Sequence, residues 1–247
     1  MFELQAVSKR YHANHALWPT SFTVGSFETT VLIGESGSGK STLLRIFMGL
    51  IPPDEGRVLF DGEPLTEENA MIQRRRMGYV IQDGGLFPHL NAEDNVLLLA
   101  RYLKMDEAQL KNRLDELLML TKFPGRCLKQ FPLQLSGGQR QRVSLMRALM
   151  LNPEVLLLDE PMGALDPMIR SDLQSDLKAI FRELRKTVIL VTHDLGEASF
   201  LGDRIILMKE GRVVQDGDFK TLSQEPADAF VSAFINAQRP PHFVNYV

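Results

Sequence analysis

A glycine-rich loop between a strand pattern and a helix pattern constrains this chain more than any other feature. Residues 34–41 read Gly-Glu-Ser-Gly-Ser-Gly-Lys-Ser and fit the pattern G-x-x-x-x-G-K-[ST]. The apolar run Val31–Ile33 leads into this loop, and a helix is expected over Ser41–Leu50. In such a loop the backbone amides surround a β-phosphate, the Lys40 ammonium offsets the β/γ charge, and the Ser41 hydroxyl ligates Mg²⁺. Residues 34–41, called the lysine loop below, therefore predict an α/β nucleotide-binding fold.

Two carboxylates follow another apolar strand pattern. The run Val155–Leu158 leads into Asp159 and Glu160, and a buried parallel strand would deliver both to its carboxyl end, where open α/β sheets bind ligands. Asp159 suits the Mg²⁺ shell, and Glu160 suits the positioning or deprotonation of an attacking water. Alone, the segment would be interpreted as a solvated acidic turn, but together with the lysine loop it favours catalysis.

Two more polar residues follow strand patterns in the same way. Gln82 ends the strand expected over Met77–Ile81, and His193 ends the strand expected over Thr187–Thr192. Each by itself is typical of an ordinary polar turn. At the same sheet edge as Glu160, however, His193 is expected to contact a γ-phosphate.

Another glycine-containing loop has the form of an anion site but lacks some of its parts. Residues 135–139 read Leu-Ser-Gly-Gly-Gln and lead into a helix expected to reach Met150. Ser136 is a good helix N-cap, and Gly137 and Gly138 let backbone amides approach an anion. This Ser-Gly-Gly segment (residues 135–139) has neither a lysine for a terminal phosphate nor a carboxylate for Mg²⁺. The chain thus contains one complete and one incomplete anion site.

Composition narrows the class of protein. The 247 residues are 44% hydrophobic with a formal charge of −3, which suits one large soluble domain with an inserted subdomain and gives no basic excess for nucleic acid. Cys127 is the only cysteine, so no disulfide framework is expected and a reducing compartment fits. There is no signal-peptide pattern, and the apolar runs are far shorter than the roughly 20 residues of a membrane span. We expect a cytosolic protein that could dock on a membrane protein.

The element pattern runs from a β-rich start through an α/β part and a helical insert to a second α/β part. Strands are expected over Phe2–Val7, Ser21–Val24, Glu28–Ile33, Gly56–Phe60 and Arg204–Met208, and helices within Asn91–Leu120, where Asp106 caps the second, and over Asp166–Leu184 and Glu225–Gln238. Arg74–Arg76 is interpreted as a solvated helix face.

These features together resemble the ATP-binding subunits of ABC transporters. The lysine loop, Gln82, the Ser-Gly-Gly segment, the Asp159-Glu160 pair, residues 164–166 (Ala-Leu-Asp) and residues 192–194 (Thr-His-Asp) occur in that family's order and spacing over roughly residues 1–220. The resemblance implies a P-loop core with a mixed, mostly parallel sheet, an N-terminal antiparallel β subdomain and a helical subdomain inserted at about 88–152. It divides the chain into an ATP-binding domain, 1–223, and a short helical tail, 224–247, without a regulatory domain.

The resemblance also assigns roles to residues. It implies that ATP contacts Tyr11, Gly34, Glu35, Ser36, Gly37, Ser38, Gly39, Lys40, Ser41, Thr42, Ser136, Gly137, Gly138, Gln139 and Asp166, that Mg²⁺ contacts Ser41, Gln82 and Asp159, and that Glu160, His193, Gln82 and Lys40 are catalytic. Tyr11 would stack on adenine, with Trp18 a weaker candidate, and Gln82 would also sense the membrane partner. Gly163 replaces a serine found in many relatives and leaves the contact through Asp166 intact.

In this family two subunits face each other head to tail, which implies a role for the incomplete anion site. Each lysine loop is closed by the Ser-Gly-Gly segment of the second copy, and a symmetric dimer holds two complete ATP sites. Residues 87–90 (Phe-Pro-His-Leu) are expected either to form part of a groove for a helix of the membrane partner or to pack locally.

Members of the superfamily that act on DNA or ribosomes carry coiled coils, zinc modules or tandem domains, which are absent from this sequence. The chain instead resembles bacterial importers, and residues 163–170, 192–198, 200–204 and 230–239 resemble the subunits that energise uptake of quaternary amines such as glycine betaine and choline. Transmembrane permease subunits and, indirectly, a substrate-binding protein are the implied partners, at the cytoplasmic face of the cell membrane. The alternatives are import of an amino acid or another small polar solute, and a nucleotide-dependent scaffold that does not transport.

Overall fold

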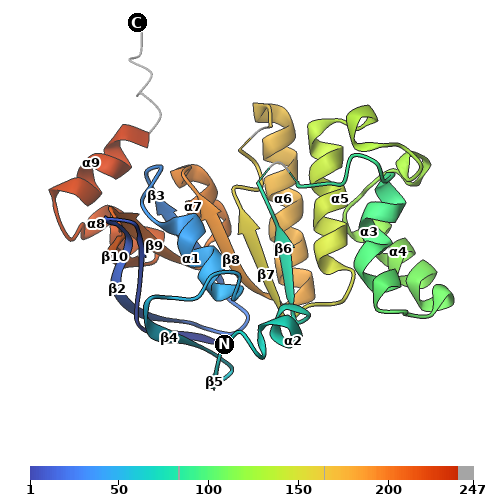
Figure 1. Ribbon diagram of the computed structural model, residues 1–247. Helices are drawn as coiled ribbons and strands as arrows, with labels where there is room; N and C mark the ends of the chain where they lie inside the picture. The colour runs from blue at the N-terminus through green and yellow to red at the C-terminus, as the bar shows by residue number, and fades with distance from the viewer. Residues whose placement is uncertain (83, 164, 239–247) are drawn as a thin grey trace, which may run out of the picture.

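A six-stranded, mostly parallel sheet forms the centre of the computed structural model, which describes residues 1–82, 84–163 and 165–238 (Figure 1). Its strand order is β10-β9-β3-β8-β7-β6. The strands are β3 (Thr29–Gly34), β6 (Met77–Val80), β7 (Val155–Asp159), β8 (Thr187–Thr192), β9 (Arg204–Lys209) and β10 (Arg212–Gly217). All neighbouring pairs are parallel except β9 with β10. The carboxyl ends of five strands therefore share one edge of the sheet.

The strand β10 was not predicted from the sequence. It forms a hairpin with β9 through Glu210 and Gly211, which both have positive φ, 47° and 76°. A two-residue turn of this kind matches the twist of an antiparallel pair. The Glu210-Gly211 pair was the sequence feature from which this hairpin could have been predicted.

A second, antiparallel sheet has the order β2-β1-β4-β5. Its strands are β1 (Phe2–Tyr11), β2 (Asn14–Val24), β4 (Glu55–Phe60) and β5 (Glu63–Pro64). The first two are longer than predicted, because register shifts between Leu4 and Arg10 interrupt the alternation of apolar and polar residues. An ion pair stabilises the polar end of β1: Lys9 Nζ lies 2.7 Å from Asp54 Oδ1.

Four strands of the central sheet, β3, β7, β8 and β9, are buried on both faces, and their successive residues enter different cores. Val31 and Ile33 pack on the helical side, whereas Leu32 between them packs with the antiparallel sheet and the first helix. The same alternation holds along β7, β8 and β9. Burial on both faces explains why these strands are continuous apolar runs in the sequence.

The longer helices are α1 (Lys40–Phe47), α3 (Ala92–Tyr102), α4 (Glu107–Leu120), α5 (Gly137–Leu149), α6 (Pro167–Leu184) and α9 (Ala229–Gln238). The shorter ones are α2 (Ala70–Arg74), α7 (Leu195–Leu201) and α8 (Phe219–Gln224), with 3₁₀ turns at Gly125–Cys127 and Pro132–Gln134. Helix α1 ends before the predicted Leu50 because Gly49 takes a φ of 60°. Helices α7 and α8 were not predicted, since seven and six residues give too little periodicity.

Helices α3, α4 and α5 gather on one side of the molecule, at the right of Figure 1. Two caps predicted from the sequence start helices here: Asp106 accepts from the amides of Ala108 and Gln109, and Ser136 accepts from the amide of Gln139. These helices lie within the range 88–152 that was expected to hold an inserted subdomain, and the division into domains stays a prediction.

The contacts of Arg76 contradict the prediction that residues 74–76 form a solvated helix face. Its guanidinium pairs with Glu154 at 2.7 Å and with Asp61, and it lies over the Phe60 ring at 4.4 Å. Because Asp61 and Glu154 come from segments distant in sequence, residues 74–76 as a whole are not a solvated face.

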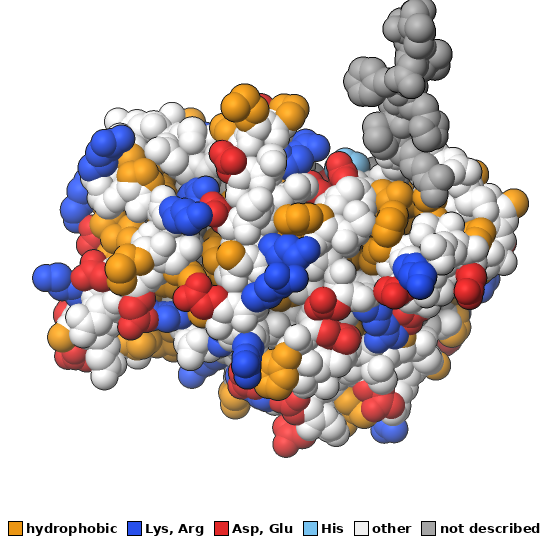
Figure 2. Space-filling model, turned by 180° about the vertical axis from the view of Figure 1, so that it is seen from behind, with side chains coloured by type: hydrophobic (Ala, Val, Ile, Leu, Met, Phe, Trp, Pro, Cys, Tyr) orange, Lys and Arg blue, Asp and Glu red, His pale blue; other side chains and the backbone are white. Residues whose placement is uncertain are grey.

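Acidic and basic side chains are interspersed on the back of the molecule (Figure 2). Among the described residues, no helix combines the length and the apolar character needed to cross a membrane. Ala164 and residues 239–247, which belong to the predicted Ala-Leu-Asp motif and to the end of the predicted tail, lie outside the described residues.

Candidate functional site

The residues predicted to act on phosphate meet at the carboxyl edge of the central sheet. The lysine loop follows β3, Asp159 and Glu160 stand at the end of β7, His193 follows β8, and Gln82 follows β6. A cleft of about 330 Å³ opens here. Its lining consists of Ala16, Ser36, Gly37, Gly39, Lys40, Ser41, Thr42, Gln82 and Glu160.

Close packing fixes the shape of the lysine loop. Gly34 has a φ of 153°, and a Cβ there would lie 2.1 Å from the carbonyl oxygen of Met208. Gly39 has a φ of 101°, and its Cβ would lie 2.5 Å from the carbonyl oxygen of Ala16. Only glycine fits both the backbone angle and the space at these two positions.

The Lys40 side chain is enclosed by its own loop. Its Nζ donates to the carbonyl oxygens of Gly34 and Glu35 at 2.7 and 2.8 Å, and the residue is buried. Burial lowers the pKa of Lys40, although the nearby Glu160 and Asp159 act in the opposite direction. An anion entering the loop would stabilise the ammonium form and release it from these carbonyl groups.

Asp159 and Ser41 join the end of β7 to the start of α1. The Ser41 hydroxyl donates to Asp159 Oδ1 at 3.1 Å, and Asp159 is buried. Burial raises the pKa of Asp159, while the hydrogen bond from Ser41 opposes this shift. A buried carboxylate beside a hydroxyl, with the Gln82 amide lining the same cleft, is an oxygen donor set that fits Mg²⁺.

Glu160 and His193 are in direct contact across two strands. His193 Nδ1 lies 3.3 Å from Glu160 Oε2. Glu160 has a φ of 45°, and its amide donates to the carbonyl oxygen of Val191 at 2.9 Å. Left-handed backbone at a residue other than glycine costs about 1 kcal/mol, and such strain is concentrated at functional sites.

The turn that carries His193 is held by a buried carboxyl that sequence reasoning missed. The Thr192 hydroxyl donates to Glu197 Oε2 at 2.6 Å and accepts from the Asp194 amide at 3.1 Å. Asp194 caps α7 by accepting from the Glu197 amide at 2.9 Å. Glu197 is buried, and burial raises its pKa. An acidic N-cap followed three residues later by glutamate was the signal available in the sequence.

The Ser-Gly-Gly segment lies elsewhere. Ser136 Oγ accepts from the Gln139 amide at 3.2 Å, and Gln139 Oε1 accepts from the Ser136 amide at 2.9 Å. The amides of Gly137 and Gly138 find no acceptor among the residues that the structure describes. The segment does not line the cleft and begins α5, on the side of the molecule formed by α3, α4 and α5 (Figure 1). The chain therefore does not bring its own two anion sites together.

Residues 17–163 match the ABC transporter family. The chain belongs to this family. It is 41% identical over 240 residues to the glycine betaine/carnitine/choline transport ATP-binding protein OpuCA of Bacillus subtilis, covering 97% of this chain and 63% of that protein. It is 44% identical over 236 residues to the glycine betaine uptake system ATP-binding protein YehX of Escherichia coli, covering 95% and 76%. The chain thus spans less than two thirds of the length of the first of these relatives.

Solved ABC cassettes have the same fold. A dimeric post-hydrolysis state of the ATP-binding cassette MJ0796, bound to ADP and phosphate, matches with a TM-score of 0.80 and 36% identity over 88% of this chain and 98% of that chain. The cassette cbiO1 of Clostridium perfringens matches with a TM-score of 0.83 and 31% identity over 96% and 93%. The family resemblance and the fold class predicted from the sequence are confirmed.

Three other predicted residues of this ABC family chain lie at the surface or near it. Tyr11 is exposed at the end of β1. The Trp18 ring stacks on the His15 ring with 3.8 Å between their centroids, and the Arg212 guanidinium lies over the Trp18 ring, 4.0 Å from its centroid. Tyr11 is therefore the more open ring. Asp166 is exposed and caps α6 by accepting from the Ile169 amide at 3.1 Å.

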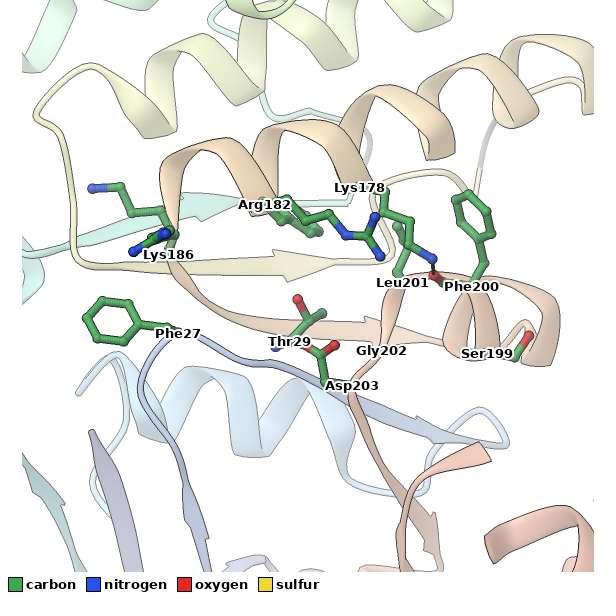
Figure 3. A pocket seen from close by; sticks show the side chains of 12 residues that line it. Phe27, Thr29, Lys178, Arg182, Lys186, Ser199, Phe200, Leu201, Gly202 and Asp203 are labelled. Atoms are coloured by element: carbon green, nitrogen blue, oxygen red, sulfur yellow. Dashed lines mark hydrogen bonds between the residues drawn. The ribbon is translucent and has the colours of Figure 1, made fainter. Parts of the chain in front are cut away.

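A hollow of about 170 Å³ lies at the opposite edge of the sheet, where β3 and β8 begin (Figure 3). Lys178, Arg182 and Lys186 line it, beside the ends of α6 and α7. Cations complement the negative ends of helices, and Lys178 Nζ donates to the carbonyl oxygen of Phe200 in α7. Lys186 Nζ donates to Asn152 Oδ1 at 2.9 Å, so two of these three cations have partners within the chain, whereas the residues predicted to act on phosphate lie at the carboxyl edge.

Proposed function

We propose that this chain is the ATP-binding and ATP-hydrolysing subunit of a bacterial ABC importer. The observation that carries the proposal is that Lys40 and Glu160 line one cleft, where Ser41 donates to Asp159 and His193 is in contact with Glu160. Phosphoryl transfer requires a cation for the phosphates, oxygen ligands for a divalent metal and a carboxylate that positions the attacking water.

The roles follow from position. Lys40 and the lysine-loop amides bind the β- and γ-phosphates, and Ser41, Asp159 and Gln82 would hold Mg²⁺, which neutralises phosphate charge when bound. Glu160 orients the attacking water and accepts its proton as the water oxygen bonds to the γ-phosphorus and the bond to the β–γ bridging oxygen breaks. His193, held 3.3 Å from Glu160, contacts the γ-phosphate.

A second copy of the chain completes the site. The free amides of Gly137 and Gly138 and the distance of this segment from its own cleft support a head-to-tail dimer with two shared ATP molecules. The similar cassette MJ0796 is dimeric in two solved structures, which supports a dimer for this chain. Tyr11 then stacks on adenine, and Asp166 lies at the interface between the copies.

The proposed solute is a quaternary amine osmoprotectant of the glycine betaine or choline type. The relatives OpuCA and YehX support this class. Another small polar solute is the second candidate, because a sulfate/thiosulfate import ATP-binding protein of Bacillus cereus is also 41% identical, over 237 residues. Transmembrane permease subunits at the cytoplasmic face of the cell membrane and a substrate-binding protein are the proposed partners.

Two measurements test the proposal. Steady-state phosphate release with Mg²⁺ and ATP separates an ATPase from a nucleotide-dependent scaffold, which would bind ATP without turnover. Uptake of labelled glycine betaine, choline and sulfate is then compared in cells that produce this chain with the permease and binding protein encoded beside it. We expect uptake of the quaternary amines alone, and none with Lys40→Ala; uptake of sulfate alone would overturn the solute class.

A further inference from the structure

The last described helix, α9, ends on the turn that carries His193. Gln238 Oε1 accepts from the amide of Leu195 at 2.7 Å. Leu195 is the first residue of α7, two positions after His193. A residue 43 positions along the chain thus contacts the backbone of the proposed catalytic turn.

This contact satisfies a donor that α7 cannot satisfy itself. The first amides of a helix have no acceptor within the helix. Asp194 accepts from the amide of Glu197 at 2.9 Å, and the Leu195 amide is left to Gln238. Leu195 is only 5% exposed with Gln238 in place, so removal of Gln238 would take away the acceptor of a donor at the edge of the core, next to His193.

Helix α9 is itself fixed at its start and in its middle. At its start Asp228 accepts from the Val231 amide at 2.9 Å, and the preceding segment is tied to β10 because Gln215 Oε1 accepts from the Ala227 amide at 2.9 Å. In its middle, Phe234 and other apolar residues of α9 are buried in the same core as Leu195. The Gln238 contact is therefore presented by a rigid element.

We propose that Gln238 is a positioning residue for His193, through which α9 sets the geometry of the catalytic turn. The connection runs from Gln238 to the Leu195 amide, through the Asp194 cap to His193, and from His193 Nδ1 to Glu160 Oε2. Through this connection, any partner or segment that displaces α9 would change the rate of ATP hydrolysis. The proposal rests on the ATP hydrolysis proposed above.

The test compares Gln238→Ala, Gln238→Glu and, as a matched control on the same helix, Asn236→Ala, whose side chain is exposed. For Gln238→Ala we expect kcat for ATP to fall about three- to tenfold with KM within about twofold, since the lysine loop is untouched. Gln238→Glu keeps an acceptor at a helix N-terminus and is expected to stay within about twofold of the unchanged protein. Hydrogen exchange of the Leu195 amide should accelerate in Gln238→Ala alone.

Equal kcat values for Gln238→Ala and the unchanged protein, or equal losses in Gln238→Ala and Gln238→Glu, would overturn the positioning role. If the unchanged protein hydrolyses no ATP, the proposed function fails instead. The exchange rate of the Leu195 amide then still decides whether Gln238 holds the turn.

Discussion

The lysine loop and the Ser-Gly-Gly segment both place glycines at the start of a helix, yet their surroundings differ. The lysine loop lies in a cleft with a buried ammonium, Lys40, and with Glu160. The Ser-Gly-Gly segment offers only backbone amides, and its polar side chains, Ser136 and Gln139, are engaged in a capping box. Both have the form of an anion site, but only the first contains groups for chemistry, which fits the proposal that the second completes another molecule's site.

The glycines of the two segments are required for different reasons. In the lysine loop, a Cβ at Gly34 would collide with backbone of the same chain, 2.1 Å from the Met208 carbonyl oxygen. In the Ser-Gly-Gly segment, the added Cβ atoms would meet side chains instead: a Cβ at Gly137 would lie 3.0 Å from Leu165 Cδ2, and one at Gly138 would lie 2.7 Å from Ile169 Cγ2. Backbone atoms of the chain therefore exclude a side chain at Gly34, whereas at Gly137 and Gly138 the neighbours are side chains.

The largest effect expected from this comparison is at Glu160. Glu160→Gln keeps the shape of the side chain but removes the group that accepts the proton of water, so kcat should fall by about 10² to 10⁴. ATP binding should remain, and the ATP-bound dimer should persist. Phosphate release and size-exclusion chromatography with light scattering measure both; near-normal turnover would remove Glu160 from catalysis.

The next effect is at Gly137. Gly137→Asp places a carboxylate against the phosphates of the opposite copy and should weaken ATP-driven dimerisation at least about tenfold, while nucleotide binding by the monomer is unchanged. Gly137→Ala adds the Cβ without the charge and serves as the control. Loss of monomer binding in Gly137→Asp would contradict a site shared between two copies.

The smallest effect concerns stability at Asp159. Its pKa is raised in the folded protein, so the folded state binds the proton more tightly and the free energy of unfolding falls as pH rises towards neutrality. Asp159→Asn should therefore raise the free energy of unfolding of the nucleotide-free protein at pH 7, and raise it less in acid, where both states hold the proton. Thermal unfolding at the two pH values checks this; the variant should also lose stabilisation by Mg²⁺ with ATP. A lower Tm at pH 7 would contradict the account.

Much of the fold could be predicted from local signals. The strands β3, β7, β8 and β9 are buried on both faces and are therefore continuous apolar runs. The lysine loop and the Ser136 cap carry specific residue types at fixed spacing. Because parallel strands end at one edge, the meeting of Asp159, Glu160 and Ser41 could be predicted as well.

The remaining features depend on contacts between distant segments. The full length of β1 and β2 is concealed by register shifts. The ion pairs of Arg76 with Asp61 and Glu154 join residues with no common pattern. The contact of Gln238 with Leu195 depends on how α9 packs on α7, which no local spacing in the sequence encodes.

A mixing experiment tests the central claim most directly, that each ATP site is shared between two copies. Lys40→Ala lacks a working lysine loop and Gly137→Asp lacks a working Ser-Gly-Gly segment, so each alone is expected to be inactive. A mixed dimer contains one intact site, made from the lysine loop of one variant and the Ser-Gly-Gly segment of the other. An equimolar mixture should therefore recover activity, up to about a quarter of the unchanged ATPase activity at protein concentrations where pairing is complete and random, since half of the dimers are then mixed and each has one of two sites. A mixture as inactive as its separate components would contradict the shared site.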